Sequence, residues 1–521
     1  MSVLHYYFPP SSPSGPSDVE TDICVYGNSA GAVTAAVQAA RSGYRCLLAI
    51  NSAWIGGLTT SGLGNTDIGQ GATIGGMARE FYRRVGRHYG AEEEWCFEPH
   101  VAEEVLWAML DEAGVQPLLR QFPCLVHQSE RRIVSVEFES GLRVRARQFI
   151  DASYEGDLLA LAGVTCTWGR EGNAAYGEIA NGFQIRETHQ FEAPISPFIV
   201  EGDPSSGLLP GINSGPAIPS GTGDRRIQAY NFRMCLTQAS DRIPFPKPVG
   251  YEPLQYELLA RYFAQGWRQL FHKFDPIRGE KTDTNNHGAV STDFIGGSER
   301  FPVASYQERE EIFQKHVVYQ QGLMWFLSHD ERVPADLRGE MGRWGLPANE
   351  FQDTGGWPRQ LYIRECRRLV SEWIVTEHDC RGYRTADDPV GLGSYAMDSH
   401  NCQRLVQDER VLNEGDVQIQ IPAPYPVSYQ AIVPRRDECS NLLVPVCISA
   451  SHIAYGSVRM EPVFMILGQS AALAAGLALE MGLNAVQDLP YAALRGWLDK
   501  FGQQLKSPSR PEGKFTQPWR Q

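Results

Sequence analysis

One stretch near the N-terminus, residues 21–60, constrains the fold of this chain more than any other. Its first six residues (TDICVY) are mostly apolar or β-branched, so they predict a strand that ends at the small residues of the segment GNSAG, residues 27–31. Residues 32–42 contain no proline and predict a helix, which Gly43 ends. Residues 44–50 again have strand character. The stretch therefore predicts a β-α-β unit and an α/β fold.

The turn after the first predicted strand indicates a dinucleotide site. Small residues let the backbone approach a pyrophosphate, and the N–H groups and dipole at the helix start favour its negative charge. The usual pattern is G-x-G-x-x-G, but in that register this chain keeps only Gly27 and has Ser29 and Ala32 at the other two places. Gly31 lies one residue before the position of the third glycine in that pattern. An acidic residue normally ends the second strand and binds the ribose hydroxyls, whereas Asn51 stands here and offers a neutral hydrogen bond.

The same turn also matches G-x-S-x-G, the nucleophile elbow of serine hydrolases, which likewise lies between a strand and a helix. An elbow serine needs strands before it and an oxyanion loop upstream, but only residues 1–20, rich in proline and serine, precede this strand. The sequence thus favours a nucleotide site over a hydrolase. A β-α-β unit that binds nothing is a third interpretation of this stretch alone.

Composition excludes several classes of partner. The chain has 521 residues, of which 42% are hydrophobic and 21% charged, and this suits two or three globular domains. Its net charge is −14 and it has no long run of lysine or arginine, so we expect no nucleic-acid partner. Eleven cysteines without C-x-x-C spacing argue against a disulfide framework and a zinc ribbon, and we predict no metal site.

Two segments bear on location. Residues 463–479 are weakly polar but are interrupted by Gln469 and Ser470 and followed by Glu480, so they predict a buried helix and no membrane span. Residues 1–20 lack the basic start, apolar core and cleavage site of a secretion signal, and they predict a flexible tail. We therefore expect a cytoplasmic protein.

The rest of the chain changes periodicity several times. Residues 54–69 form a loop dense in Gly, Ser and Thr, which indicates backbone lying against a flat ligand. Helices are predicted at residues 74–89 and 100–113, and a small antiparallel meander at 123–128, 132–139 and 142–150. Residues 168–427 are irregular and predict a substrate-facing region with helices only at 253–271, 306–329 and 356–375. Strand character returns at residues 441–448.

Four stretches carry a family resemblance: residues 25–43 (VYGNSAGAVTAAVQAARSG), 55–69 (IGGLTTSGLGNTDIG), 149–164 (FIDASYEGDLLALAGV) and 444–475. Together they resemble the FAD-dependent oxidoreductases with a two-dinucleotide-binding fold, in particular the subgroup usually described simply as FAD-dependent oxidoreductase. Residues 223–237, 281–296 and 360–370 are also similar to that subgroup. The resemblance implies a Rossmann-like, glutathione-reductase-like FAD domain, a large mixed α+β substrate domain and noncovalent FAD.

The resemblance and the periodicity together predict five regions. They are a flexible tail at residues 1–20, the N-terminal part of the FAD-binding domain at 21–165, a substrate or cap domain at 166–430, the C-terminal part of the FAD-binding domain at 431–485, and a C-terminal helix and tail at 486–521.

The resemblance also implies which residues face the cofactor. Residues 27–32 and 151–153 are expected at the pyrophosphate, residues 56–60 along the flavin and ribityl chain, and Val126 beside the adenine. Pro462 suits the first turn of a helix, whose N-terminus is expected to point at the flavin N1–C2=O edge and to favour flavin reduction. The full predicted set is Gly27, Asn28, Ser29, Ala30, Gly31, Ala32, Asn51, Gly56, Gly57, Leu58, Thr59, Thr60, Val126, Asp151, Ala152, Ser153, Asp157, Ser457, Val458, Arg459, Met460 and Glu461.

Removing a hydride from a CH–OH carbon requires a base for the hydroxyl proton, and histidine suits that task near neutral pH. The first candidate is His452 in the predicted flavin-facing loop, with Tyr455 as a proton donor or substrate contact; His287 and His400 are reserve candidates. Arg233 and Arg364 are predicted to bind a carboxylate or another polar group of the substrate, because a guanidinium offers paired donors.

Three functional hypotheses follow. The leading one is an FAD-dependent dehydrogenase or oxidase that takes a hydride from a polar hydroxylated or aminated small molecule to flavin N5. The second is a flavin-dependent monooxygenase, although the D-G-x-x-S motif usual in that class is missing. The third is a non-catalytic binding protein that has lost FAD, which the glycine-poor first turn and the missing ribose acid keep open.

Overall fold

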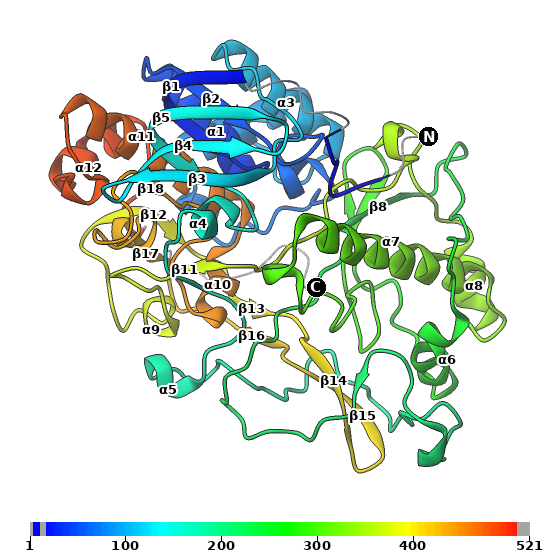
Figure 1. Ribbon diagram of the computed structural model, residues 1–521. Helices are drawn as coiled ribbons and strands as arrows, with labels where there is room; N and C mark the ends of the chain where they lie inside the picture. The colour runs from blue at the N-terminus through cyan, green and yellow to red at the C-terminus, as the bar shows by residue number, and fades with distance from the viewer. Residues whose placement is uncertain (1–3, 11–16, 508–521) are drawn as a thin grey trace.

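The computed structural model describes residues 4–10 and 17–507, and its largest sheet has six strands (Figure 1). The strand order is β2-β1-β5-β4-β3, and β18 pairs with β5 off this path. These strands are β1 (Ser17–Tyr26), β2 (Cys46–Ala49), β3 (Pro123–Ser129), β4 (Arg132–Phe138), β5 (Leu142–Asp151) and β18 (Leu442–Leu443).

The parallel part of this sheet is centred on β1, which pairs in parallel with β2 on one side and with β5 on the other. Helix α1 (Ala30–Arg41) connects β1 to β2, so the predicted β-α-β unit is present. β3, β4 and β5 pair antiparallel and form the predicted meander. The mixed α/β class is therefore confirmed, while the two-dinucleotide-binding subtype stays a prediction.

Helix α11 (Glu461–Glu480) crosses α1 so closely that backbone touches backbone. A Cβ atom on Gly31 would lie 2.6 Å from the carbonyl oxygen of Phe464, and one on Gly468 would lie 2.1 Å from the carbonyl oxygen of Gly31. The hydroxyl of Thr34 donates to the carbonyl oxygen of Met465 over 2.8 Å. The crossing therefore has no room for side chains at these two glycines, and it ties the two ends of the chain together.

Helix α11 is also apolar along its length. Its most apolar window has a mean hydropathy of 1.7, and by length and composition the helix could cross a membrane, but 94% of that window is buried inside the fold. Such burial is the behaviour of a core helix.

The other helices among the described residues surround this sheet or belong to the irregular region. α2 and α3 follow the glycine-rich loop within two residues of their predicted starts, and α7 matches its prediction. The bounds are α2 (Gly76–His88), α3 (Pro99–Glu112), α4 (Asp157–Leu161), α5 (Asn173–Tyr176), α6 (Glu257–Ala264), α7 (Tyr306–His329), α8 (Ala335–Met341), α9 (Glu377–Cys380), α10 (His452–Val458) and α12 (Tyr491–Lys500).

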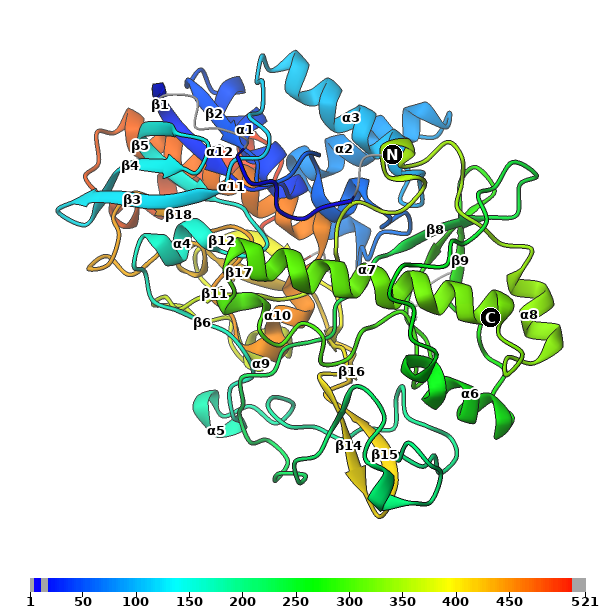
Figure 2. The same cartoon turned by 45° about the vertical axis from the view of Figure 1, so that its right-hand side comes forward.

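The strands within residues 168–427, a region predicted to be irregular, are all short, and the region also contains the short helices α5, α8 and α9, which were not predicted. α7, green in Figures 1 and 2, runs beside the large sheet, and β14 and β15 form a hairpin far from it. From just before this region to its end, the strands are β6 (Cys166–Thr167), β7 (Ile212–Asn213), β8 (Met234–Thr237), β9 (Phe274–Ile277), β10 (Lys281–Thr284), β11 (Arg368–Leu369), β12 (Pro389–Gly393), β13 (Met397–Ser399), β14 (Gln403–Gln407), β15 (Arg410–Glu414), β16 (Val417–Ile419) and β17 (Tyr425–Ser428).

Three predicted elements differ from the structure. Residues 356–375 form no helix, because Gly355 and Gly356 adopt φ values of +71° and +86° and a proline follows, so the chain does not enter the helical region. The helix predicted at residues 253–271 is a 3-10 turn followed by α6 and ends before Gly266. The strand predicted at residues 441–448 is reduced to β18, since Pro445 cannot donate to a ladder.

The prediction of a flexible tail at residues 1–20 is wrong for the part that the structure describes. Residues 17–20 belong to β1, and residues 4–10 lie against the fold. Residues 1–3 and 11–16 of the predicted tail, and residues 508–521 of the predicted C-terminal tail, lie outside the described residues. The other four predicted regions stay a prediction.

Candidate functional site

The predicted pyrophosphate turn is held against the end of β5. Gly27 has φ +125°, and a Cβ atom there would lie 2.4 Å from the backbone of Ala152 and Ser153. The hydroxyl of Ser29 accepts a hydrogen bond from the Ala32 N–H and donates one to the Ala152 carbonyl oxygen. Ser29 therefore caps α1, which is not the exposed position that a hydrolase nucleophile needs.

Two buried asparagines beside this turn have unused acceptors. Asn28 donates to the Gln360 side chain over 2.7 Å, and Asn51 donates to Glu155 Oε2 over 3.2 Å. The Oδ1 atom of each asparagine has no hydrogen-bond partner among the described residues. Buried acceptors without donors fit a ligand that carries hydroxyl or N–H groups, as a flavin dinucleotide does. The tight turn, the helix start and these acceptors together suit FAD.

The glycine-rich loop is connected to the start of α11 through a buried carboxyl group. Residues 57–60 form a 3-10 turn, in which Thr59 donates to Glu461 Oε2 over 2.7 Å. The Tyr154 hydroxyl donates to Glu461 Oε1 over 2.7 Å and accepts from the Leu58 N–H. Burial raises the pKa of Glu461 to about 7, and the hydrogen bonds from Thr59 and Tyr154 offset the loss of solvation only in part. The sequence prediction missed Tyr154, although it lies in a stretch that carries the family resemblance.

The raised pKa of Glu461 predicts that the stability of the fold depends on pH. Between about pH 4.5 and 7 the unfolded chain has released a proton that folded Glu461 still holds, so this contribution to stability is full below the unfolded pKa and is lost as the pH rises through the folded one. The loss amounts to roughly 3 kcal/mol, since one pKa unit is worth about 1.4 kcal/mol. Glu461→Gln should remove it, as measured by urea unfolding at several pH values. The exposed Glu331→Gln is the control, and a Glu461→Gln effect that is equal at pH 4.5 and 7.5 contradicts the assignment.

The predicted residues after β5 stabilise their own turn. Asp151 accepts from the Ser153 N–H and hydroxyl and from the Leu159 N–H, and burial raises its pKa to about 6. Asp157 begins α4 and forms a bidentate ion pair with Arg309 at 2.8 and 2.9 Å. Burial opposes its ionisation, but Arg309 outweighs burial and holds the pKa of Asp157 below its usual range. Val126 lies in β3 as predicted, opposite Val136.

A second buried polar group, which we call the arginine–histidine cluster, lies in the irregular region and comprises Tyr362, Arg364, Asp293, His400, Asp398 and Arg459. Arg364 lies 3.0 Å from Asp293, whose other oxygen lies 2.7 Å from His400 Nδ1. His400 Nε2 lies 3.4 Å from Asp398. The predicted substrate anchor Arg364 and the reserve base His400 are thus brought together.

Arg459 joins this cluster from the junction between α10 and α11. Its guanidinium donates to the Tyr362 hydroxyl over 2.6 Å and to Asp398 over 3.3 Å. The Nε atoms of Arg364 and Arg459 have no hydrogen-bond partner among the described residues. Asp398 retains 20% side-chain exposure, so the cluster reaches solvent there. Burial opposes ionisation of Asp398, but His400 and Arg459 outweigh burial and keep its pKa below the usual range.

Arg233 lies beside the glycine-rich loop, where a Cβ atom on Gly62 would approach its carbonyl oxygen to 2.0 Å. Its guanidinium forms a bidentate pair with Asp283 at 2.8 and 2.6 Å, and Asp67 lies 3.8 Å away. Asp67 also accepts from the Tyr395 hydroxyl over 3.1 Å. Arg233 is therefore a paired cation near the loop, outside the arginine–histidine cluster.

The prediction that His452 lies in a loop is wrong, because it begins α10 with Ser451 as the N-cap. His452 is 2% exposed; its Nδ1 lies 2.8 Å from Glu365 and its Nε2 lies 2.9 Å from Ser399. This order of groups is similar to a hydrolase triad, but Ser399 is fully buried and donates to the Gly415 carbonyl oxygen. Both ring nitrogens are engaged, so the geometry makes His452 part of a buried hydrogen-bond chain.

The other predicted catalytic residues lie apart. The Tyr455 hydroxyl donates to the Val446 carbonyl oxygen inside the core. His287 stacks on His272 at 4.3 Å between ring centroids, and burial and that neighbour lower its pKa to about 4.

Three residues predicted to bind the cofactor lie where α10 ends and α11 begins. Ser457 donates to the Tyr395 carbonyl oxygen, and Val458 and Met460 are buried beside it.

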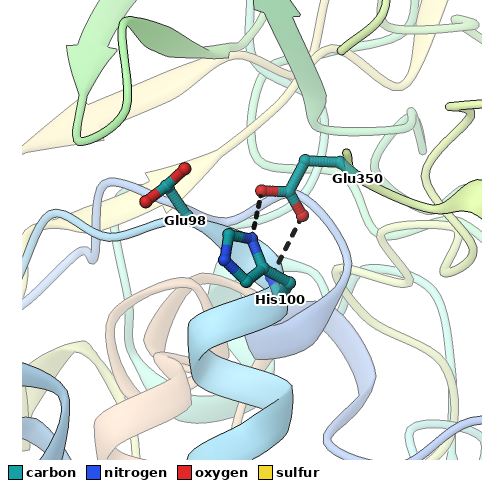
Figure 3. A group of neighbouring side chains, drawn as sticks. All are labelled: Glu98, His100 and Glu350. Atoms are coloured by element: carbon teal, nitrogen blue, oxygen red, sulfur yellow. Dashed lines mark hydrogen bonds and ion pairs between the residues drawn. The ribbon is translucent and has the colours of Figure 1, made fainter. Parts of the chain in front are cut away.

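Figure 3 shows a group of side chains with metal-ligand chemistry, Glu98, His100 and Glu350. His100 Nδ1 lies 2.7 Å from Glu350. The ammonium group of Lys281 donates to Glu98 over 2.6 Å and to Glu350 over 2.7 Å. Lys281 therefore pairs with both carboxylates, and the group is an ion-pair network.

Several solved structures are similar to part of this chain. They include a geranylgeranyl bacteriochlorophyll reductase-like protein from Thermoplasma acidophilum (18% identity, TM-score 0.22, 29% of this chain and 43% of that chain). A myxobacterial chondrochloren halogenase matches at 19% identity and TM-score 0.23 over 29% of this chain and 41% of that one. L-proline dehydrogenase from P. horikoshii matches at 14% identity and TM-score 0.24 over 30% and 59%. In each case the match spans less than two thirds of the solved chain.

No curated protein matches this sequence. The sequence model of the family described as FAD dependent oxidoreductase, however, matches residues 22–498, which is most of the chain. This protein therefore belongs to the FAD-dependent oxidoreductase family and is an enzyme whose cofactor is FAD.

Proposed function

We propose that this enzyme is a dehydrogenase or oxidase that takes a hydride from a polar hydroxylated or aminated small molecule, on a two-dinucleotide-binding fold. The observation that carries this proposal is the arginine–histidine cluster, which is buried, reaches solvent at Asp398 and meets the start of α11 through Arg459. Bound FAD supplies the hydride acceptor. The protein residues supply orientation of the substrate and a proton acceptor.

His400 is the best-placed proton acceptor in this proposal. Asp293 holds Nδ1 at 2.7 Å, which fixes the ring and leaves Nε2 toward Asp398 at 3.4 Å, the longer of the two contacts. Arg364 and Arg459 are the orienting groups, since each has an unpartnered Nε and both guanidinium groups lie over the Tyr362 ring, at 4.5 and 5.5 Å from its centroid. A substrate with an anionic or strongly polar group beside its CH–OH or CH–NH carbon fits this set.

The function is tested by anaerobic mixing of the holoenzyme with sugars, polyols, hydroxy acids and amines. Bleaching of the flavin by one substrate alone supports the proposal, and fast recovery of colour in air identifies an oxidase. Bleaching that occurs only with NADH or NADPH overturns it in favour of the monooxygenase hypothesis. A purified protein that binds no FAD supports the non-catalytic hypothesis.

Arg364→Lys should raise the KM for the substrate by about 10-fold with little change in kcat. Lysine keeps a positive charge facing Asp293 but loses the planar pair of donors, which removes about one charge-assisted hydrogen bond. Steady-state kinetics measure the effect. The control is Arg332→Lys, since Arg332 pairs with Asp330 at the half-exposed end of α7. An equal effect of both substitutions, or a fall in kcat alone, contradicts a substrate-binding role for Arg364.

A further inference from the structure

The N-terminal segment, residues 4–10, lies beside the carboxyl ends of β1 and β2, where Tyr6 lines a cavity together with Asn28 and Asn51. Its backbone is fixed by α7: the N–H groups of Tyr6 and Tyr7 donate to Glu310 Oε2 over 2.8 and 2.9 Å. The Leu4 carbonyl oxygen accepts from Gln314 over 2.7 Å. Figure 2 shows this dark blue segment between the large sheet and α7. In open α/β sheets ligands bind in the crevice outside these strand ends, so the segment lies where a nucleotide is expected.

Side chains of the N-terminal segment fill that crevice. The Tyr6 ring is 9% exposed and contacts Phe122, Phe301 and Phe313. The Tyr7 ring stacks on Tyr306 at 5.7 Å, and its hydroxyl donates to Glu139. These contacts place an aromatic wall around the segment, and flat aromatic walls of this kind also suit a purine ring.

The hydroxyl group of Tyr6 contacts the carboxyl group of Glu155, which lies where a ribose-binding acid is expected. The Tyr6 hydroxyl donates to Glu155 Oε1 over 3.1 Å and accepts from Arg309 over 3.3 Å. The other oxygen of Glu155 accepts from Asn51, the residue that follows β2 where the ribose-binding acid of dinucleotide-binding proteins normally stands. Glu155 comes from the loop after β5, yet its carboxyl group lies at that place.

We propose that Glu155 provides the carboxylate for the ribose hydroxyls of the adenosine half of FAD, and that the N-terminal segment competes with that half for the same site. A tyrosine hydroxyl and a ribose hydroxyl are both O–H donors, so Tyr6 uses an oxygen of Glu155 that the ribose requires. Arg309 and Arg367 pair with the neighbouring Asp157, whereas the carboxyl group of Glu155 accepts from the neutral donors Tyr6 and Asn51.

The remaining space supports competition. The cavity beside Tyr6, Asn28 and Asn51 has a volume of about 10 Å³, far below the roughly 300–1,000 Å³ of pockets that hold a drug-sized ligand. The adenosine half therefore enters only when the segment withdraws. This inference concerns cofactor binding and does not depend on which substrate the enzyme oxidises.

The test is a binding titration of full-length apoprotein with FAD and, in parallel, with FMN, which lacks the adenosine half. Tyr6→Ala should lower the FAD Kd by about 10–100-fold, because the segment loses the burial of an aromatic ring. Tyr6→Phe loses only the hydroxyl and should lower it by about 2–10-fold. The FMN Kd should not change in either variant. The control is Tyr383→Phe, at a tyrosine that is 75% exposed.

Glu155→Gln completes the test, since it should raise the FAD Kd by about 10-fold and leave the FMN Kd unchanged. Circular dichroism measures whether each variant is folded. If Tyr6→Ala is unfolded, the FAD Kd of Tyr6→Phe, the smallest change, decides the test. An FAD Kd that is unchanged, or that changes together with the FMN Kd, overturns the proposal. Weaker FAD binding by the Tyr6 variants also overturns it, because the segment would then clamp the bound cofactor. Failure of every variant to bind FAD also overturns the proposal.

Discussion

His400→Ala should slow the reduction of bound flavin by substrate by ~10²–10⁴-fold, the usual effect of removing a general base. The physical reason is the orientation of its ring. Asp293 holds Nδ1 at 2.7 Å, so Nε2 is the nitrogen directed to the part of the arginine–histidine cluster that reaches solvent. Stopped-flow absorbance under anaerobic conditions measures the rate, and the variant should retain its FAD because the His400 ring pairs with Asp293 and Asp398 in the arginine–histidine cluster.

Two other histidines provide controls for this prediction. His287→Ala should reduce at the parent rate, since His287 is stacked on His272 outside the cluster. His452→Ala should lose stability more than rate, because it leaves the fully buried Glu365 without one of its partners. The assignment fails if His400→Ala reduces at the parent rate while His452→Ala keeps its FAD and is slow; the base would then belong to α10.

Gly27→Ala should abolish FAD binding and lower the free energy of unfolding by about 2–6 kcal/mol. Two costs add: a backbone conformation at φ +125° that side chains rarely adopt, worth ~1–3 kcal/mol, and overpacking against Ala152 and Ser153, worth about as much again. Urea unfolding measures the stability, and flavin absorbance after gel filtration measures the bound cofactor.

Gly43→Ala is the matched control, because it separates the two costs. Gly43 also has a positive φ, +88°, but no atom lies within 4 Å of the position its Cβ would take. It should therefore show only the conformational cost, roughly 1–3 kcal/mol, and retain FAD. Equal losses in the two variants would mean that the contact with the end of β5 does not constrain the turn.

The parts of the fold that sequence could predict are those with a strong local period. The β-α-β unit, the meander, α7 and α11 follow from alternation, from helical spacing and from the small residues at their ends. Residues 356–375 also have apolar and basic residues at helical spacing, but the glycine pair and proline at their start keep the chain out of the helical region. Arg364 is thereby available to the buried cluster.

The site was less predictable, because it depends on pairs of residues far apart in sequence. His452 was a reasonable base on its position alone, but its ring nitrogens bind Glu365, 87 residues away, and Ser399, 53 residues away. The unused ribose position at Asn51 was visible in the sequence, whereas the carboxyl group beside it comes from Glu155, 104 residues later. No local pattern records such pairings.

The backbone contact between α1 and α11 has a consequence for synthesis of the protein. Thr34 and Met465, which are bonded across it, are 431 residues apart. At ~5–20 residues per second a ribosome needs roughly 20–90 s to pass from one to the other. During that interval the first β-α-β unit has left the ribosome, while α11, the helix that packs against α1 at Gly31, has not yet been made. The nascent chain therefore exposes this face of α1 to chaperones and to other chains, and cofactor can be acquired in its complete site only after nearly the whole protein has been made.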